Sequence, residues 1–186
     1  MTQFLYRPVS TRVASVLART GVSPTTVSWV GAAIALGGAA LLAGGYYLAG
    51  AIVTLASVIV DCVDGDLARA TGRSSPVGAF LDSVLDRWMD AALILGIAYS
   101  DLDEYAGVGG LALTASFVTS YTRARAQSLG VDCPEGIGGR DSRILILVLA
   151  AVTGLIWWGL VLVAVTGFAT SVQRLVSGAR RLSARG

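Results

Sequence analysis

The chain has no histidine and no lysine, so arginine supplies all 14 of its basic side chains. The absence of histidine excludes a histidine general base, histidine-ligated metals and a histidine-ligated haem. The two cysteines, Cys62 and Cys133, form no CxxC pair, which argues against a disulfide framework or a zinc site. Charge is also scarce, because only 14% of the 186 residues are charged, whereas a soluble domain carries roughly a quarter. With 54% hydrophobic residues and a mean hydropathy of +0.70, the composition predicts an integral membrane protein with a single domain over residues 1–186.

Six apolar segments of helix length follow an amphipathic N-terminal segment. Residues 1–20 are predicted to form a helix that lies in the membrane interface, because its apolar residues make one stripe and its arginines lie outside that stripe. The stripe comprises Leu5, Val9, Val13, Val16 and Leu17. Ser23–Pro24 and Ser75–Pro76 each offer an N-cap followed by proline at the first helical position. The predicted fold is therefore all-α, with six transmembrane helices at about residues 25–42, 47–70, 76–99, 105–128, 140–156 and 158–177.

The last apolar run, from Ile144 to Val176, decides the number of spans, because it is too long for one helix of about 20 residues. A reversal near Gly154–Gly159 gives six spans and places the arginine-bearing connections on one side of the membrane. The opposite loops hold only acidic charges, at Asp101, Asp103 and Glu104. This asymmetry predicts a multi-pass protein of the plasma membrane with both termini and the active site in the cytoplasm.

Acidic residues gather on the second and third predicted spans. Six lie between Asp61 and Asp90, and four of these stand in a fixed frame. The frame reads Asp61-x-x-Asp64-Gly65-x-x-Ala68-Arg69, then Gly78-x-x-x-Asp82-x-x-x-Asp86. Residues three and four apart share a helix face, so each half of the frame forms one stripe. The segment joining the two spans is arginine-bearing, so both stripes are predicted to lie toward the cytoplasm. Asp66 and Asp90 fall outside the frame.

Four carboxylates on two facing stripes would repel one another and could not all ionise unaided. Two divalent cations would remove that repulsion, and oxygen ligands without histidine or cysteine suit Mg²⁺ or Mn²⁺. Two carboxylate-bound metals are a common device for holding phosphates during an in-line displacement. Gly65 and Gly78 would let a ligand approach the backbone, and Arg69 has donors for a phosphate. On these grounds alone, a proton or ion path in a transporter is the alternative that stays open.

The frame resembles the signature of the CDP-alcohol phosphotransferase family, and all eight specified positions agree in identity and spacing. The resemblance implies a metal-dependent transfer of a phosphoalcohol from a CDP-alcohol to an acceptor alcohol, with release of CMP. It assigns two Mg²⁺ or Mn²⁺ ions to Asp61, Asp64, Asp82 and Asp86, and it makes Asp86 the general base. It implies that the CDP group is bound by Asp61, Asp64, Gly65, Ala68, Arg69, Gly78 and Asp82. A homodimer is implied by the resemblance alone.

Three further segments resemble the branch of this family that uses an inositol phosphate as acceptor. The branch comprises phosphatidylinositol-phosphate, archaetidylinositol-phosphate and di-inositol-phosphate-phosphate synthases. There a serine and three basic residues bind the inositol phosphate, and the matching residues here are Ser120, Arg123, Arg140 and Arg174. The other interpretation of arginines in these segments, Arg143 among them, is ordinary anchoring beside lipid phosphates.

These sequence patterns leave alternatives open for both the donor and the acceptor. The donor stays open between CDP-diacylglycerol, CDP-archaeol and CDP-inositol, because residues 6–10 and 139–143 resemble the enzymes that use CDP-inositol. Within the same enzyme class, the alternative is a phosphatidylglycerophosphate-synthase-like enzyme that uses glycerol 3-phosphate. The expected partners are a CDP-alcohol, a phosphorylated alcohol and membrane lipid. No nucleic acid is expected, because the arginines follow one membrane face.

Overall fold

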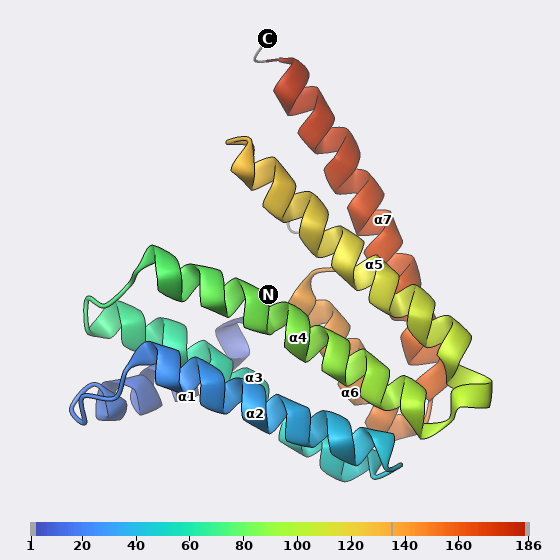
Figure 1. The fold of residues 1–186 in the computed structure, drawn as a ribbon, viewed down its shortest axis with the longest axis horizontal. Helices are drawn as coiled ribbons and strands as arrows, with labels where there is room; N and C mark the ends of the chain where they lie inside the picture. Colours follow the sequence, from blue (N-terminus) through green and yellow to red (C-terminus); the bar gives the residue numbers. More distant parts are fainter. Residues whose placement is uncertain (1–2, 135, 185–186) are drawn as a thin grey trace. The chain divides into compact units, whose positions relative to one another are not determined.

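The computed structural model describes residues 3–134 and 136–184, and their side chains from Val9 onward. The side chains of Leu5 and Arg7, and the last arginine, Arg185, lie outside this part. All regular secondary structure in the described residues is helical (Figure 1). The helices are α1 (Gln3–Leu17), α2 (Pro24–Ala43), α3 (Tyr47–Ala70), α4 (Pro76–Ser100), α5 (Leu102–Ser128), α6 (Arg140–Thr153) and α7 (Ile156–Ser183).

Helices begin and reverse where the sequence signals are strong. α2 starts at Pro24, and the side chain of Ser23 accepts a hydrogen bond from the backbone amide of Thr26. α4 likewise starts at Pro76, directly after a serine. The last apolar run reverses at Gly154, whose φ of +75° lies in the left-handed region that favours glycine. The predicted reversal in this run is confirmed.

Helix α7 is longer than the sixth predicted span. The helix continues to Ser183, whereas the span is predicted to end at about residue 177. Its last turn contains Arg180 and Arg181, which are good helix formers and interact favourably with the negative end of the helix dipole. A helix therefore need not end where its apolar stretch ends.

Length and composition identify α2, α3 and α7 as helices able to cross a membrane. Both these apolar helices and the apolar composition indicate insertion in a membrane, and the chain is a membrane protein. α6 has only 14 residues. At a rise of about 1.5 Å per residue it extends roughly 21 Å, which is shorter than a hydrocarbon core of about 30 Å. The arrangement with six spans stays a prediction.

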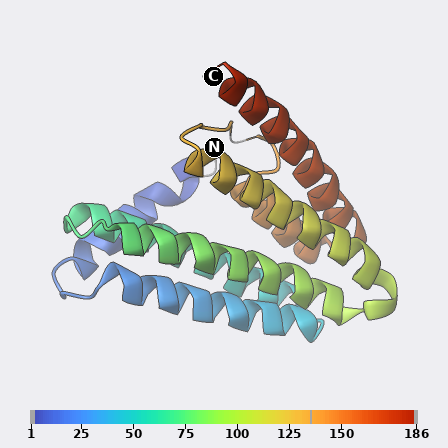
Figure 2. The same ribbon diagram turned by 45° about the horizontal axis from the view of Figure 1, so that its top comes forward.

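The contacts divide the chain into two compact units, residues 1–96 and 97–186, and the boundary falls inside α4. In the first unit α1, α2 and α3 share a core formed by Ala14, Val27, Val63 and Leu67. α2 also packs against α4, and Figure 2 shows these two helices side by side. The prediction of a single domain stays a prediction.

The face of α1 that contacts the protein is made of small residues. Ser10 is fully buried and Ala14 is 1% exposed, whereas the apolar side chains of Val9, Val13 and Val16 are 41–64% exposed. Of the predicted apolar stripe, Val9, Val13 and Val16 therefore point away from the first unit, whereas Leu17 at the end of the helix packs against its core. An outward apolar stripe is what a helix at a membrane interface requires.

In the second unit α7 packs against both α5 and α6. Leu160 and Val163 of α7 are fully buried. A Cβ added at Gly167 would lie 2.9 Å from Cβ of Ala115, so glycine lets α5 and α7 approach closely. The hydroxyl of Thr119 donates to the carbonyl of Gly167 at 2.7 Å and joins the same two helices.

Candidate metal and phosphate site

Three carboxylates meet between α3 and α4. Asp61 and Asp64 stand one turn apart on α3, and Asp82 lies near the start of α4. Each contributes one oxygen, and these oxygens lie within 4.8 Å of one another. The structure thus brings together three of the four residues that the sequence predicts as metal ligands.

The donor atoms of this group fit a hard divalent cation. Negative charges this close repel one another, and Asp64 is only 5% exposed, so water screens its charge poorly. All three donors are carboxylate oxygens, the ligands that Mg²⁺ and Mn²⁺ prefer over the nitrogen and sulfur of typical zinc sites. The residues present therefore fit the metal that the sequence predicts.

Asp86 lies one turn beyond Asp82 on α4 and is not a member of the group of three. Its Oδ2 is 3.5 Å from Nη1 of Arg87, and its side chain is 15% exposed. Of the group of three, only Asp82 shares this helix with Asp86. Its predicted roles as base and ligand stay predictions.

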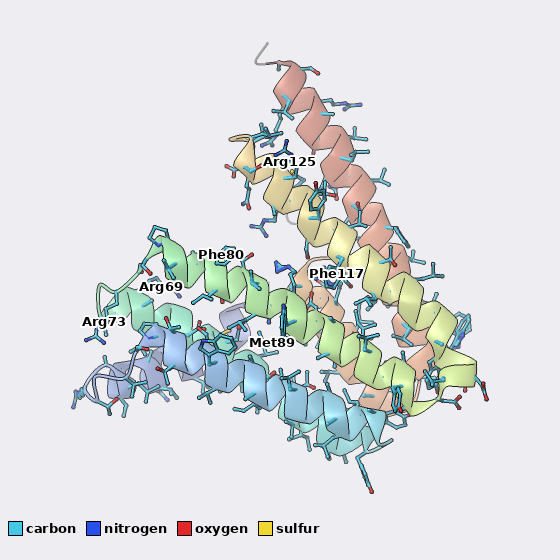
Figure 3. The ribbon with its side chains drawn as sticks, viewed as in Figure 1. Arg69, Arg73, Phe80, Met89, Phe117 and Arg125 are labelled. Carbon is cyan, nitrogen blue, oxygen red and sulfur yellow. The ribbon has the colours of Figure 1, made fainter. Side chains whose placement is uncertain are left out.

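Arg69 lies in the last turn of α3 (Figure 3). A Cβ added at Gly65 would lie 3.4 Å from Nη1 of Arg69, so the guanidinium lies over the glycine backbone. At Gly78 an added Cβ would meet only the hydroxyl of Ser75, at 3.3 Å. Ala68, between these positions, is half-buried. The glycines of the frame therefore allow the close approach of Arg69 at Gly65 and of Ser75 at Gly78.

Ser28 is a residue of the site that the sequence did not reveal. It lies one turn inside α2, and its hydroxyl donates to Oδ2 of Asp64 and also approaches the carbonyl of Pro24 at 3.2 Å. A hydrogen bond of this kind fixes the orientation of a carboxylate that holds a metal. A serine 36 residues away from Asp64 has no local pattern that would link the two.

The four predicted acceptor residues lie in the second unit. Ser120 is half-buried and Arg123 is exposed, both on α5, while Arg140 is half-buried at the first position of α6. Arg174 of α7 is only 3% exposed. Its Nε donates to the carbonyl of Pro134 at 3.1 Å, and its Nη1 donates to the carbonyl of Thr119 at 2.8 Å. Arg174 thus joins α7 both to α5, directly before Ser120, and to the segment that leads into α6.

The described residues of that segment, 129–134 and 136–139, are held by further hydrogen bonds to helix side chains. The amide of Gly138 donates to the hydroxyl of Thr170 at 2.8 Å, and its carbonyl accepts from Nη1 of Arg143 at 2.8 Å. Arg143 is 2% exposed, so its guanidinium serves the protein interior and not lipid phosphates. These bonds fix the backbone two residues before Arg140.

The profile of the CDP-alcohol phosphatidyltransferase family matches residues 21–173, which include the three carboxylates and the whole frame. The chain belongs to this family. It is a metal-dependent CDP-alcohol phosphotransferase, and the transporter interpretation of its acidic cluster is set aside.

Relatives of this CDP-alcohol phosphotransferase match it over nearly its whole length. Archaetidylinositol phosphate synthase of Pyrococcus horikoshii is 35% identical over 176 residues, which cover 92% of this chain and 91% of that protein. Phosphatidylinositol phosphate synthase of Streptomyces avermitilis is 38% identical over 195 residues, covering 95% and 80%.

The fold is also similar to that of a solved enzyme. Phosphatidylinositol phosphate synthase of Mycobacterium tuberculosis with CDP-DAG bound matches with a TM-score of 0.84 and 30% identity, covering 92% of this chain and 94% of that one. The same synthase in complex with manganese and citrate matches with a TM-score of 0.83 and 30% identity, covering 91% and 88%.

The hydrogen bond from Ser28 to Asp64 gives a prediction for metal affinity. Replacing Ser28 by alanine should weaken Mn²⁺ binding about 10- to 100-fold, because Asp64 loses the partner that orients it. Electron paramagnetic resonance titration of free Mn²⁺ against purified protein without substrate measures the affinity. Ser83→Ala is the matched control, since that exposed serine neighbours Asp82 and lies outside the group. Unchanged affinity in Ser28→Ala would contradict the role given to this hydrogen bond.

Proposed function

We propose that this enzyme transfers a phosphoalcohol from a CDP-alcohol to an inositol phosphate and releases CMP. The observation on which the proposal depends is the group of three carboxylates within 4.8 Å, set in the eight-residue frame of a CDP-alcohol phosphatidyltransferase. The relatives named as archaetidylinositol phosphate synthase and phosphatidylinositol phosphate synthase support the acceptor. So do the serine and three arginines at the positions that match that branch.

The chemistry follows from the acidic residues. The Asp86 carboxylate takes the proton of the acceptor hydroxyl, whose oxygen forms a bond to the β-phosphorus of the donor while the bond from that phosphorus to the CMP oxygen breaks. Asp61, Asp64, Asp82 and Asp86 hold two Mg²⁺ or Mn²⁺ ions, which, when bound, neutralise charge on the diphosphate.

The donor is bound by the rest of the frame. Arg69 donates to the donor phosphates through its planar set of N–H groups. Gly65, Ala68 and Gly78 leave room for the CDP group, and Asp61, Asp64 and Asp82 line the same site.

The acceptor phosphate is bound by Ser120, Arg123, Arg140 and Arg174. Guanidinium groups suit a phosphomonoester dianion, because their paired N–H donors match two phosphate oxygens. Arg140 occupies the first position of α6, where the positive end of the helix dipole also favours an anion. Arg174 has a second role, since its bonds to Thr119 and Pro134 hold the segment before Arg140.

We also propose the finer membrane arrangement: α1 in the interface, six spans, both termini and the active site in the cytoplasm of the plasma membrane, and a homodimer. The arginine-bearing connections support this sidedness.

A cysteine introduced at Asp103, in a chain whose Cys62 and Cys133 are replaced by serine, should react with an impermeant thiol reagent added to intact cells. A cysteine introduced at Ser74 should not react. The reverse labelling pattern would show that the protein has the opposite orientation in the membrane. Light scattering of the purified protein tests the dimer.

The central test is CMP release by the purified enzyme. With Mn²⁺ and one of the three candidate CDP-alcohols, CMP should appear when inositol phosphate is added, and its release should stop in EDTA. Asp86→Asn should slow release by about 10²- to 10⁴-fold, the usual contribution of a general base. Faster release with glycerol 3-phosphate than with inositol phosphate would refute the acceptor assignment, and turnover in EDTA would refute the metal site.

Arg140 tests the acceptor site separately from the donor site. Arg140→Ala removes one charge-assisted contact, worth roughly 1.5–3 kcal/mol, so KM for inositol phosphate should rise about 10- to 150-fold. KM for the CDP-alcohol should hardly change. Arg125→Ala is the matched control, because that exposed arginine of α5 bonds only its neighbour Ser128 among the described contacts. A wild-type KM for inositol phosphate in Arg140→Ala would exclude this residue from the acceptor site.

A further inference from the structure

Asp66 stands within the frame but occupies none of its eight specified positions. Its carboxylate accepts a hydrogen bond on each oxygen. Nη2 of Arg69 donates to Oδ1 at 2.7 Å, and the hydroxyl of Ser10 donates to Oδ2 at 2.6 Å. The Asp66 side chain is 11% exposed, whereas that of Arg69 is 64% exposed. One carboxylate therefore joins α1 to the guanidinium that lies over Gly65.

The α1 side of this link is fixed by packing. Ser10 is fully buried, and Ala14, one turn further along α1, packs against Val63 and Leu67 of α3. Residues four apart share a helix face, so Ser10 and Ala14 make a single contact face toward α3. The hydroxyl of Ser10 thus has a defined position from which to hold the Asp66 carboxylate.

The ion pair between Asp66 and Arg69 is not explained by a contribution to folding stability. An ion pair with so exposed a partner contributes little to the free energy of folding, because water screens it and the long side chain loses entropy. A long side chain that is already held in one orientation loses less entropy when it binds a ligand. The geometry therefore favours a role for this pair in binding over a role in folding.

We propose that Asp66 is a positioning residue for the donor site: supported by Ser10, it holds the Arg69 guanidinium in the orientation that meets the donor diphosphate. Asp66 itself contacts Arg69 and not the donor. The inference rests on the proposed function, which assigns Arg69 to the donor phosphates. It also makes α1 part of the donor site, through one serine hydroxyl.

A double-mutant cycle tests this with binding as the readout. Calorimetric titration of CDP in the presence of Mn²⁺ is measured for wild type, Asp66→Ala, Arg69→Ala and the double variant. Asp66→Ala should weaken CDP binding about 2- to 12-fold, the equivalent of immobilising one long side chain. Arg69→Ala should weaken it about 10- to 150-fold by removing a charge-assisted contact. The double variant should bind CDP as Arg69→Ala does, because Asp66 acts only through Arg69.

Further variants separate positioning from folding. Asp66→Asn keeps the volume and an oxygen for Ser10 but loses the charge opposite Arg69, so it should weaken CDP binding as Asp66→Ala does, with an unchanged thermal midpoint. Ser10→Ala should weaken CDP binding in the same direction. Ser15→Ala is its control, since that exposed serine of α1 bonds only the Arg12 carbonyl among the described contacts, and it should bind CDP normally.

Different results would refute the donor role of Arg69 and the positioning role of Asp66. If Arg69→Ala binds CDP like the wild type, the donor role of Arg69 in the proposed function is wrong. If Arg69→Ala weakens binding but Asp66→Ala and Asp66→Asn do not, Asp66 does not position it. Full additivity in the double variant would likewise overturn the inference, because Asp66 would then act independently of Arg69.

Discussion

Repulsion among three carboxylates within 4.8 Å is the constraint on which the first unit depends. Asp64 is almost fully buried, so water screens its charge poorly, and cations among the three carboxylates would relieve their repulsion. Because the donors are all oxygens, the cation is a hard one. The same repulsion suits catalysis: a site that needs cations to neutralise its own charge is also a site that can hold a diphosphate through those cations.

Around this group, the first unit provides polar partners from helices that carry no frame residue. α2 supplies Ser28 to Asp64, and α1 supplies Ser10 to Asp66. Both serines are small, so they allow close helix packing while satisfying a carboxylate that would otherwise be costly to bury. Helices α1 and α2, which carry no frame residue, therefore also orient the side chains of Asp66 and Asp64.

The second unit uses arginine in a comparable way. Arg143 and Arg174 are almost fully buried, and they donate hydrogen bonds to the backbone carbonyls of Gly138 and Pro134 in an irregular segment. Irregular backbone in an apolar protein needs such donors, because its carbonyls cannot pair within a helix. The five N–H groups of a guanidinium can serve several carbonyls at once, which explains why an arginine predicted to bind acceptor also holds the segment in place.

The sequence by itself determined the family, the helical class, the caps at Pro24 and Pro76 and the reversal at Gly154. Each of these depends on residues within a few positions of one another, where helix periodicity and turn chemistry are sufficient. The same periodicity placed Asp61 and Asp64 on one face, and the family frame supplied Asp82. Only the tertiary structure decided the partners of these residues. Ser28 reaches Asp64 across 36 positions, Ser10 reaches Asp66 across 56, and Arg174 reaches Thr119 across 55. Such pairs depend on how helices pack, and packing is decided by the shapes of whole faces, which no local spacing records.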